Sequence, residues 1–214
     1  MTISLSDAGK RYNRDWIFRH FNYSFHSGTS YAITGPNGSG KSTLLQAIGG
    51  ALALSEGKLQ YELIAAGSQP STNNYQPSTD NLFRHISIAA PYLEVIEEMT
   101  ATEFLQFHEK FKPFLPGLGI KAIIARVALE PAAHKQIRYY SSGMKQRVKL
   151  AQAIFSDTPV VLLDEPCTNL DAAGIALYQE LVAAYCGNRL VIVSSNDEAE
   201  YGFCRESVNI LQYK

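Results

Sequence analysis

Hydrophobic and polar residues alternate over the first part of the chain, which predicts a β-rich beginning. Residues 2–7 alternate as in a strand, and the polar residues 9–15 favour a turn. Aromatic residues alternate at the end of the stretch 16–25, which predicts a second strand antiparallel to the first. Residues 26–28 favour a hairpin turn into the apolar strand 29–34.

The pattern then changes from a helix to a strand and on to a polar stretch. Residues 43–48 fit a helix, residues 55–57 a turn, and residues 58–64 another strand. Residues 65–81 are polar and rich in turn-forming residues, so we expect an exposed excursion without chemistry. A short strand is predicted over 84–89.

Residues 100–157 have the apolar spacing of helices. Helices are predicted over 102–111, 120–129 and 142–155, and prolines and glycines separate the first two. Four aromatic residues are expected in the core of this part rather than in a ligand site, although an exposed share of them would offer a surface to a partner helix: Phe104, Phe107, Phe111 and Phe114.

Continuous apolar runs mark the last part of the chain. Residues 160–163 and 190–193 are apolar throughout, which is typical of parallel strands buried on both faces. A helix is predicted over 172–185 and a last strand over 208–211. This order predicts an α/β fold with a mixed central sheet, an N-terminal antiparallel β part and a helical subdomain.

Composition narrows the class of protein. The chain has 214 residues, of which 46% are hydrophobic, and a formal net charge of −1, so nothing indicates a nucleic-acid surface. Its three cysteines lack metal-ligand spacing and suit a reducing compartment. No signal peptide is evident, and the apolar runs are far shorter than the ~20 residues that cross a bilayer. We therefore expect a cytoplasmic protein that reaches a membrane only through a partner.

The most specific motif lies between the strand 29–34 and the helix 43–48, and it matches the phosphate-loop pattern G-x-x-x-x-G-K-[ST]. Its glycines let backbone N–H groups face an anion, and the helix N-terminus adds partial positive charge. The lysine is expected to reach the β- and γ-phosphates, and the following serine to ligate Mg²⁺. The predicted nucleotide-binding residues are Gly35, Pro36, Asn37, Gly38, Ser39, Gly40, Lys41, Ser42 and Thr43.

Two carboxylates follow the buried strand 160–163. Asp164 is placed to hold Mg²⁺ through water, and Glu165 to polarise an attacking water. The alternative, a pair of solvated turn acids, does not explain why they follow a buried strand in a chain with a phosphate loop.

Two further stretches carry candidate binding residues. The helix that begins at Ser142 offers a second anion site, with a hydroxyl and free N–H groups at its N-terminus. Tyr12 lies in the first predicted turn, where its ring is suited either to stack on a base or to cap the hairpin.

These motifs together resemble the ATP-binding cassette ATPase, the nucleotide-binding domain of ABC transporters, over essentially the whole chain. The phosphate loop 35–43 and the magnesium strand 162–166 match in order and spacing. Residues 168–171 resemble the family's D-loop, and residues 141–147 resemble its signature, which most often reads Leu-Ser-Gly-Gly-Gln. The family's first-turn aromatic residue falls on Tyr12, which favours stacking on adenine.

The resemblance implies a P-loop NTPase fold of the ABC ATPase type, with a single domain over 1–214. A helical subdomain over about 92–157 would be inserted in an ATP-binding core formed by 1–91 and 158–214. ATP and Mg²⁺ would be bound between two cassettes paired head to tail, in a homodimer. Ser141 and Gly143 would clamp the γ-phosphate in trans, and an integral membrane permease would be driven by closure and reopening.

Three departures from the family pattern predict a slow ATPase. The signature has Tyr140, Ser142 and Met144 where Leu, Gly and Gln are usual. Pro91 occupies the place of the Q-loop glutamine and has neither a side-chain amide nor a backbone N–H. Asn196 replaces the switch histidine; it still bonds a phosphate oxygen but cannot become a cation.

Two other functions remain open at this point. A cassette with weakened motifs would act as an ATP-gated binding module on a protein partner, without transport. A small-molecule or nucleotide kinase would leave the signature segment and the Asp164–Glu165 pair unexplained.

Overall fold

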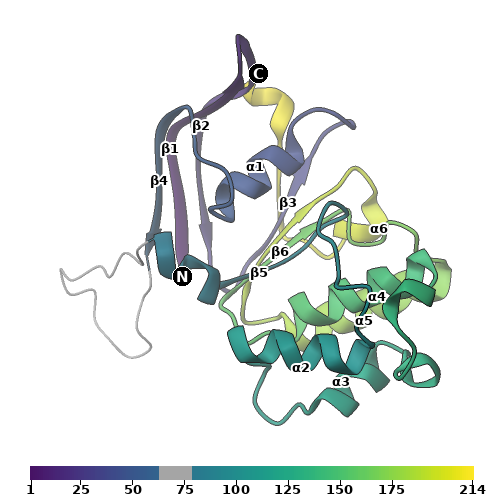
Figure 1. Ribbon diagram of the computed structural model, residues 1–214. Coiled ribbons are helices and arrows are strands. Elements are labelled where there is room, and N and C mark those ends of the chain that lie inside the picture. The colour runs from purple at the N-terminus through teal and green to yellow at the C-terminus, as the bar shows by residue number, and fades with distance from the viewer. Residues whose placement is uncertain (63–78) are drawn as a thin grey trace.

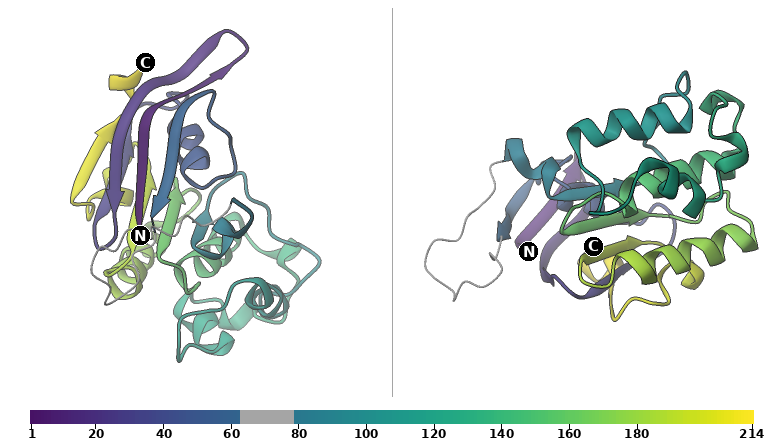
Figure 2. Two further views of the ribbon diagram at one scale, coloured as in Figure 1. Left: turned by 90° about the vertical axis from the view of Figure 1, so that its left-hand side faces the viewer. Right: turned by 90° about the horizontal axis from the view of Figure 1, so that it is seen from below.

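The computed structural model describes residues 1–62 and 79–214, which form two sheets and a helical layer (Figure 1). The first sheet has three antiparallel strands in the order β2-β1-β4, shown face on in Figure 2. Its strands are β1 (Thr2–Tyr12), β2 (Asp15–His26) and β4 (Glu56–Glu62). The antiparallel pair predicted at the start of the chain is therefore present.

The second sheet is parallel throughout and has the order β5-β6-β7-β3-β8. Its strands are β3 (Ser30–Thr34), β5 (Ile86–Ala89), β6 (Val160–Asp164), β7 (Leu190–Ser194) and β8 (Glu206–Asn209). The α/β fold with an antiparallel N-terminal part is confirmed. The predicted mixed central sheet is wrong, because the antiparallel and the parallel strands lie in separate sheets.

Helices connect the parallel strands. The α-helices are α1 (Lys41–Ile48), α2 (Ala101–Phe111), α3 (Ile120–Arg126), α4 (Ser142–Ile154), α5 (Ala172–Tyr185) and α6 (Glu198–Tyr201). Four short 3-10 helices complete the described chain: η1 (Thr79–Arg84), η2 (Glu130–Ala132), η3 (Ile137–Tyr139) and η4 (Ile210–Tyr213). Within 1–62 and 79–214, none of the helices has the length and apolar character needed to span a membrane.

Two hydrophobic cores lie on opposite faces of the parallel sheet, because successive side chains of a strand point to opposite faces. Leu162 and Ile192 join α1 and the antiparallel sheet in one core. Val161 and Val193, their neighbours along the chain, join α2 to α5 in the other. The buried strands β6 and β7 thus hold α1 on one side and α2 to α5 on the other (Figure 1).

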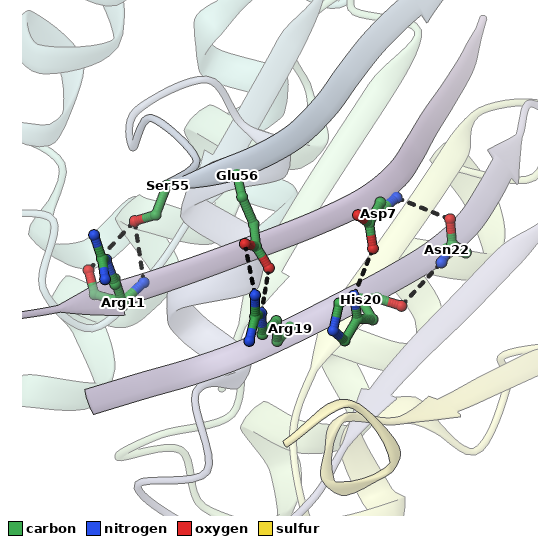
Figure 3. A network of polar contacts seen from close by, with 7 residues as sticks. All are labelled: Asp7, Arg11, Arg19, His20, Asn22, Ser55 and Glu56. Carbon is green, nitrogen blue, oxygen red and sulfur yellow. Dashed lines mark hydrogen bonds and ion pairs between the residues drawn. The ribbon is translucent and has the colours of Figure 1, made fainter. Parts of the chain in front are cut away.

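The predicted turn over 9–15 is wrong in extent, because β1 continues to Tyr12. Register shifts interrupt the β1–β2 pairing beyond Leu5, and Asp7 and His20 have positive φ angles of 49° and 52°. Such bulges break the period of two that a strand prediction relies on. Polar pairs cover the outer face here, including His20 Nδ1 with Asp7 Oδ1 at 2.6 Å (Figure 3).

The predicted hairpin at 26–28 is also wrong, because β3 does not pair with β2. β3 lies between β7 and β8 in the parallel sheet. A short polar turn between two apolar runs looks the same from sequence whether the chain returns beside its own strand or crosses to another sheet. The turn predicted at 55–57 is too long, since β4 begins at Glu56.

The three helices predicted over 100–157 are present as α2, α3 and α4, but the aromatic prediction is wrong for two residues. Phe104 and Phe114 are each 6% exposed, whereas Phe107 and Phe111 are 44% and 60% exposed. The latter two rings contact each other on α2, with centroids 5.1 Å apart. Most of the predicted excursion 65–81 lies outside the described residues, and its last residues begin η1.

Candidate active site

The phosphate-loop residues connect β3 to α1 in a conformation that requires glycine. Gly35, Gly38 and Gly40 have φ angles of 145°, 76° and 98°. A Cβ atom on Gly35 would lie 2.8 Å from the Ser39 hydroxyl oxygen, and one on Gly40 would collide with the Ile17 side chain. Gly40 also precedes the first turn of α1, so the loop ends at a helix N-terminus.

Lys41 points back into this loop. Its side chain is buried, and Nζ donates hydrogen bonds to the carbonyl oxygens of Gly35 at 2.9 Å and Pro36 at 3.2 Å. Ser42 and Thr43 follow on the first turn of α1. The loop therefore combines an ammonium group with the positive end of a helix, an arrangement suited to an anion.

Asp164 ends the buried strand β6 and is 1% exposed. Three buried side-chain oxygens lack a hydrogen-bond partner among the described residues: Asp164 Oδ1, Ser39 Oγ and Ser194 Oγ. Burial raises the pKa of Asp164, and the hydroxyls of Ser42 and Ser194 oppose this rise. A buried carboxylate with one oxygen free of hydrogen bonds, beside hydroxyl oxygens, is the kind of donor set that a hard divalent cation such as Mg²⁺ prefers.

Glu165 follows with a φ of 42°, a left-handed conformation uncommon for a residue other than glycine. Its N–H donates to the Ser194 carbonyl oxygen at 2.9 Å. With Asn37 and Asn196 it lines a cavity of about 290 Å³. The ends of β6 and β7 and the phosphate loop after β3 thus bring these three predicted residues together at the carboxyl edge of the sheet.

The predicted signature residues Ser141 and Gly143 do not line the cavity of Glu165. Ser141 caps α4, and its Oγ accepts a hydrogen bond from the Met144 N–H at 3.2 Å. Ser141 and Gly143 line a second cavity of about 270 Å³ together with Asn169 and Asp171. Within one chain the structure does not bring them to the phosphate loop, although Leu170 lines both cavities.

Tyr12 ends β1 and is 48% exposed. The Lys10 ammonium lies 5.2 Å from the centroid of its ring. The β1–β2 hairpin reaches the phosphate loop through Ile17, which packs against Gly40. Tyr12 therefore belongs to the hairpin beside the loop.

Tyr92 lies at this edge of the sheet and was missed from sequence. Tyr92 is 44% exposed, and its partial burial together with the charge of Asp164 raises the pKa of Tyr92 to about 12, while a hydrogen bond with the Gln46 side chain opposes the rise. It follows Pro91, whose carbonyl oxygen accepts from Lys149 Nζ at 3.0 Å. Ala89 pairs with Leu163 in parallel strands, so the segment after β5 lies close to Asp164. This proximity follows from the strand order and is not visible in the sequence.

Glu200 was missed as well. It is 5% exposed, lines the Glu165 cavity and accepts a hydrogen bond from the Cys167 N–H at 2.7 Å. In the sequence it is one of three acids among residues 197–200, and nothing in the pattern distinguishes it from its neighbours.

Comparison with known proteins adds sequence relatives. A family model described as ABC transporter matches residues 18–168. The cytochrome c biogenesis ATP-binding export protein CcmA of Agrobacterium fabrum is 29% identical and covers 92% of this chain and 90% of its own. CcmA of Brucella abortus is 32% identical, with coverage of 88% and 81%. The uncharacterized ABC transporter ATP-binding protein YybJ of Bacillus subtilis is 28% identical, with coverage of 94% and 89%.

Solved structures share the fold. A putative ABC transporter ATP-binding protein from Pyrococcus furiosus covers all of both chains with a TM-score of 0.79 at 18% identity. The dimeric bacterial cassette MJ0796 has a TM-score of 0.80 at 22% identity and covers 97% of this chain and 94% of its own. Together with the match of the family model, these findings place the chain in the ABC transporter family, as one of its ATP-binding cassettes.

Proposed function

We propose that this chain is the ATP-binding and ATP-hydrolysing subunit of an ABC transporter and powers transport through separate membrane subunits. The observation that carries the proposal is the convergence of Asn37, Glu165 and Asn196 on one cavity beside the glycine-rich loop. In this site Lys41 and the loop N–H groups bind the phosphates, and Tyr12 stacks on the adenine. Glu165 orients the attacking water, and Asn196 donates a hydrogen bond to the γ-phosphate.

Asp164 and Ser42 would hold Mg²⁺. Bound there, the ion would supply positive charge that stabilises the phosphate oxygens. The unpaired Asp164 Oδ1 supports this assignment, because a buried carboxylate oxygen without a partner is costly unless a ligand satisfies it.

In this proposal a second cassette, a second copy of this chain, supplies the signature residues that complete the ATP site. Ser141 and Gly143 line a cavity separate from that of Glu165, so a partner is needed to bring a signature to the phosphate loop. The dimeric cassette MJ0796 shares the fold. A membrane permease is the further partner, and it would place the chain at the cytoplasmic side of a membrane.

Within the cassette we propose a helical subdomain over about 92–157, inserted between the core segments 1–91 and 158–214. The chain leaves the core after β5 and returns at β6, and these two strands are paired neighbours. Helices α2, α3 and α4 lie together away from the phosphate loop (Figure 1).

The test is the mass of the purified chain in solution, measured by light scattering with and without Mg·ATP. Glu165→Gln removes the base and is expected to trap ATP, so this variant shifts from monomer to dimer only with Mg·ATP. The matched control is Glu165→Gln combined with Lys41→Ala, which loses the phosphate contact and stays monomeric. A Glu165→Gln variant that binds ATP yet remains monomeric contradicts the homodimer.

Pro91 and Asn196 favour a second function, because they replace the glutamine and the histidine that the family resemblance expects in the catalytic site. The chain would then be an ATP-gated cassette that hydrolyses ATP slowly and acts on a protein partner without transport. Purification from membranes in detergent separates the two functions: an integral membrane protein that co-purifies stoichiometrically supports transport, and a soluble partner supports the gated cassette.

A further inference from the structure

A buried carboxylate on α6 shares the cavity of Glu165 and has no role in the chemistry described so far. Glu200 is 5% exposed and lines that cavity with Glu165 and Asn196. Burial raises its pKa, as do the charges of Asp197 and Glu165, while the Ser195 hydroxyl and the Cys167 N–H oppose the rise. A carboxylate kept in such surroundings needs a partner that satisfies it.

That partner is the turn that carries Glu165. Glu200 Oε1 accepts a hydrogen bond from the Cys167 N–H at 2.7 Å. The turn itself is closed by the Thr168 N–H, which donates to the Glu165 carbonyl oxygen at 3.1 Å. The Glu200 carboxylate therefore fixes the backbone two residues beyond Glu165.

Glu200 is itself held on a rigid support. The Tyr178 hydroxyl donates to the Glu200 carbonyl oxygen at 2.8 Å, and Gln179 Nε2 donates to the Ala199 carbonyl oxygen at 2.8 Å. Tyr178 is fully buried on α5. The short helix α6 is thus anchored to α5, and it directly follows the segment between β7 and α6 that carries Asn196.

The backbone of Glu165 needs such support. Its left-handed φ of 42° is rarely adopted by residues with a side chain and persists only where the surroundings enforce it. One constraint is the bond from the Glu165 N–H to the Ser194 carbonyl oxygen at 2.9 Å. The bond from Cys167 to Glu200 is a second constraint, on the other side of Glu165.

We propose that Glu200 is a positioning residue for Glu165: its carboxylate holds the Cys167 N–H, keeps Glu165 directed into the cavity, and couples this turn to the segment bearing Asn196. The proposal rests on the proposed function, in which Glu165 orients the attacking water. Glu200 acts through the backbone and does not touch the reacting atoms.

The test compares three variants of Glu200 by steady-state ATPase kinetics. Glu200→Ala loses the acceptor and is expected to lower kcat by ~10- to 100-fold while KM for ATP is unchanged, because a misplaced base costs rate rather than binding. Glu200→Gln keeps an acceptor oxygen at the same length and recovers most of the rate. Glu200→Asp keeps the charge but is one methylene short, and it behaves like the alanine variant. The matched control is Glu198→Ala, an exposed position on the same helix, which retains the wild-type rate.

Hydrogen exchange at residues 165–170 provides a readout that does not depend on hydrolysis. The proposal expects faster exchange of the Cys167 N–H in Glu200→Ala and wild-type exchange in Glu200→Gln. Wild-type kcat together with wild-type exchange in Glu200→Ala overturns the proposal, as does an active Glu200→Asp beside an inactive Glu200→Gln. A wild-type chain without ATPase activity contradicts the proposed function instead, and the exchange experiment still decides the role of Glu200.

Discussion

At the scale of single residues, Asn196 is the departure with the most direct chemical consequence. Its side chain shares a cavity with Glu165, at the position where the family resemblance expects a histidine. An amide donates a hydrogen bond but carries no charge, so it stabilises a developing negative charge less than an imidazolium does.

Asn196→His is therefore expected to raise the rate of ATP hydrolysis by about tenfold, which corresponds to ~1.4 kcal/mol of transition-state stabilisation. Phosphate release under single-turnover conditions measures the change. Asn196→Gln, which remains neutral, serves as the control and should not accelerate hydrolysis. An unchanged rate in the histidine variant would mean that the missing cation does not limit turnover.

Gly143 predicts a second effect at this scale. A Cβ atom there would lie 2.8 Å from the Asn169 carbonyl oxygen, and the colliding partner is backbone. Gly143→Ala is expected to lower the free energy of unfolding by ~1–3 kcal/mol and to abolish the ATP-dependent dimer of the Glu165→Gln variant. Gly187→Ala is the matched control, since a Cβ at Gly187 meets nothing within 4 Å. Urea unfolding and light scattering measure the two effects, and an ATP-dependent dimer that survives in Gly143→Ala contradicts a tight fit between signature and D-loop.

At the scale of elements, Arg189 joins the end of α4 to the start of β6. Its buried guanidinium donates to the carbonyl oxygens of Ile154 at 2.6 Å, Thr158 at 2.7 Å and Ser156 at 2.8 Å. A helix end leaves carbonyl groups unpaired, and here one side chain satisfies several groups of the connection. The sequence pattern predicts both elements but not the residue that holds their connection.

Arg189→Met keeps the aliphatic volume and leaves those buried carbonyl groups unpaired, so it should reduce the free energy of unfolding by about 3 kcal/mol or more. Equilibrium urea denaturation measures the loss. Arg205→Met, at an exposed position, should change stability by less than ~0.5 kcal/mol. Equal stability of the two variants would show that water replaces the guanidinium.

A second effect at the element scale concerns α2 and pH. Burial and the charge of Lys112 lower the pKa of His108 to about 4, and its Nε2 lies 2.8 Å from Ser156 Oγ. In the unfolded chain the imidazole titrates near ~6.5, so between this pH and 4 only the unfolded state binds the proton. The free energy of unfolding should therefore fall by about 3 kcal/mol as the pH is lowered through this window.

His108→Gln removes this titration, and its unfolding free energy should depend less on pH between 6.5 and 4. Urea denaturation at several pH values measures the slope. His134→Gln, at an exposed position on the same helical part, should keep the slope of the wild type. If the unfolding free energies of wild type and His108→Gln depend equally on pH, a group other than His108 causes the loss of stability in acid.

At the scale of the whole molecule, the order of elements could be predicted from sequence, but several spatial relations could not. The apolar runs of β6 and β7 predict the buried parallel strands that the structure contains, and the loop pattern around Lys41 predicts the candidate phosphate site. Pairing partners are a tertiary property, so the separation of the two sheets and the bulges of β1 were not visible. For the same reason the contribution of Glu200 depends on a contact between residues 33 positions apart.

The guanidinium groups of Arg11 and Arg19 lie 5.5 and 4.5 Å from the ring centroid of Trp16, the sole tryptophan of the chain. The adjacent residue, Ile17, packs against Gly40 of the phosphate loop. Tryptophan emission from this molecule thus comes from one indole beside the phosphate loop, in a charged and partly exposed environment. We therefore expect the tryptophan emission to change when nucleotide enters or leaves the site, which would let binding be followed without a label.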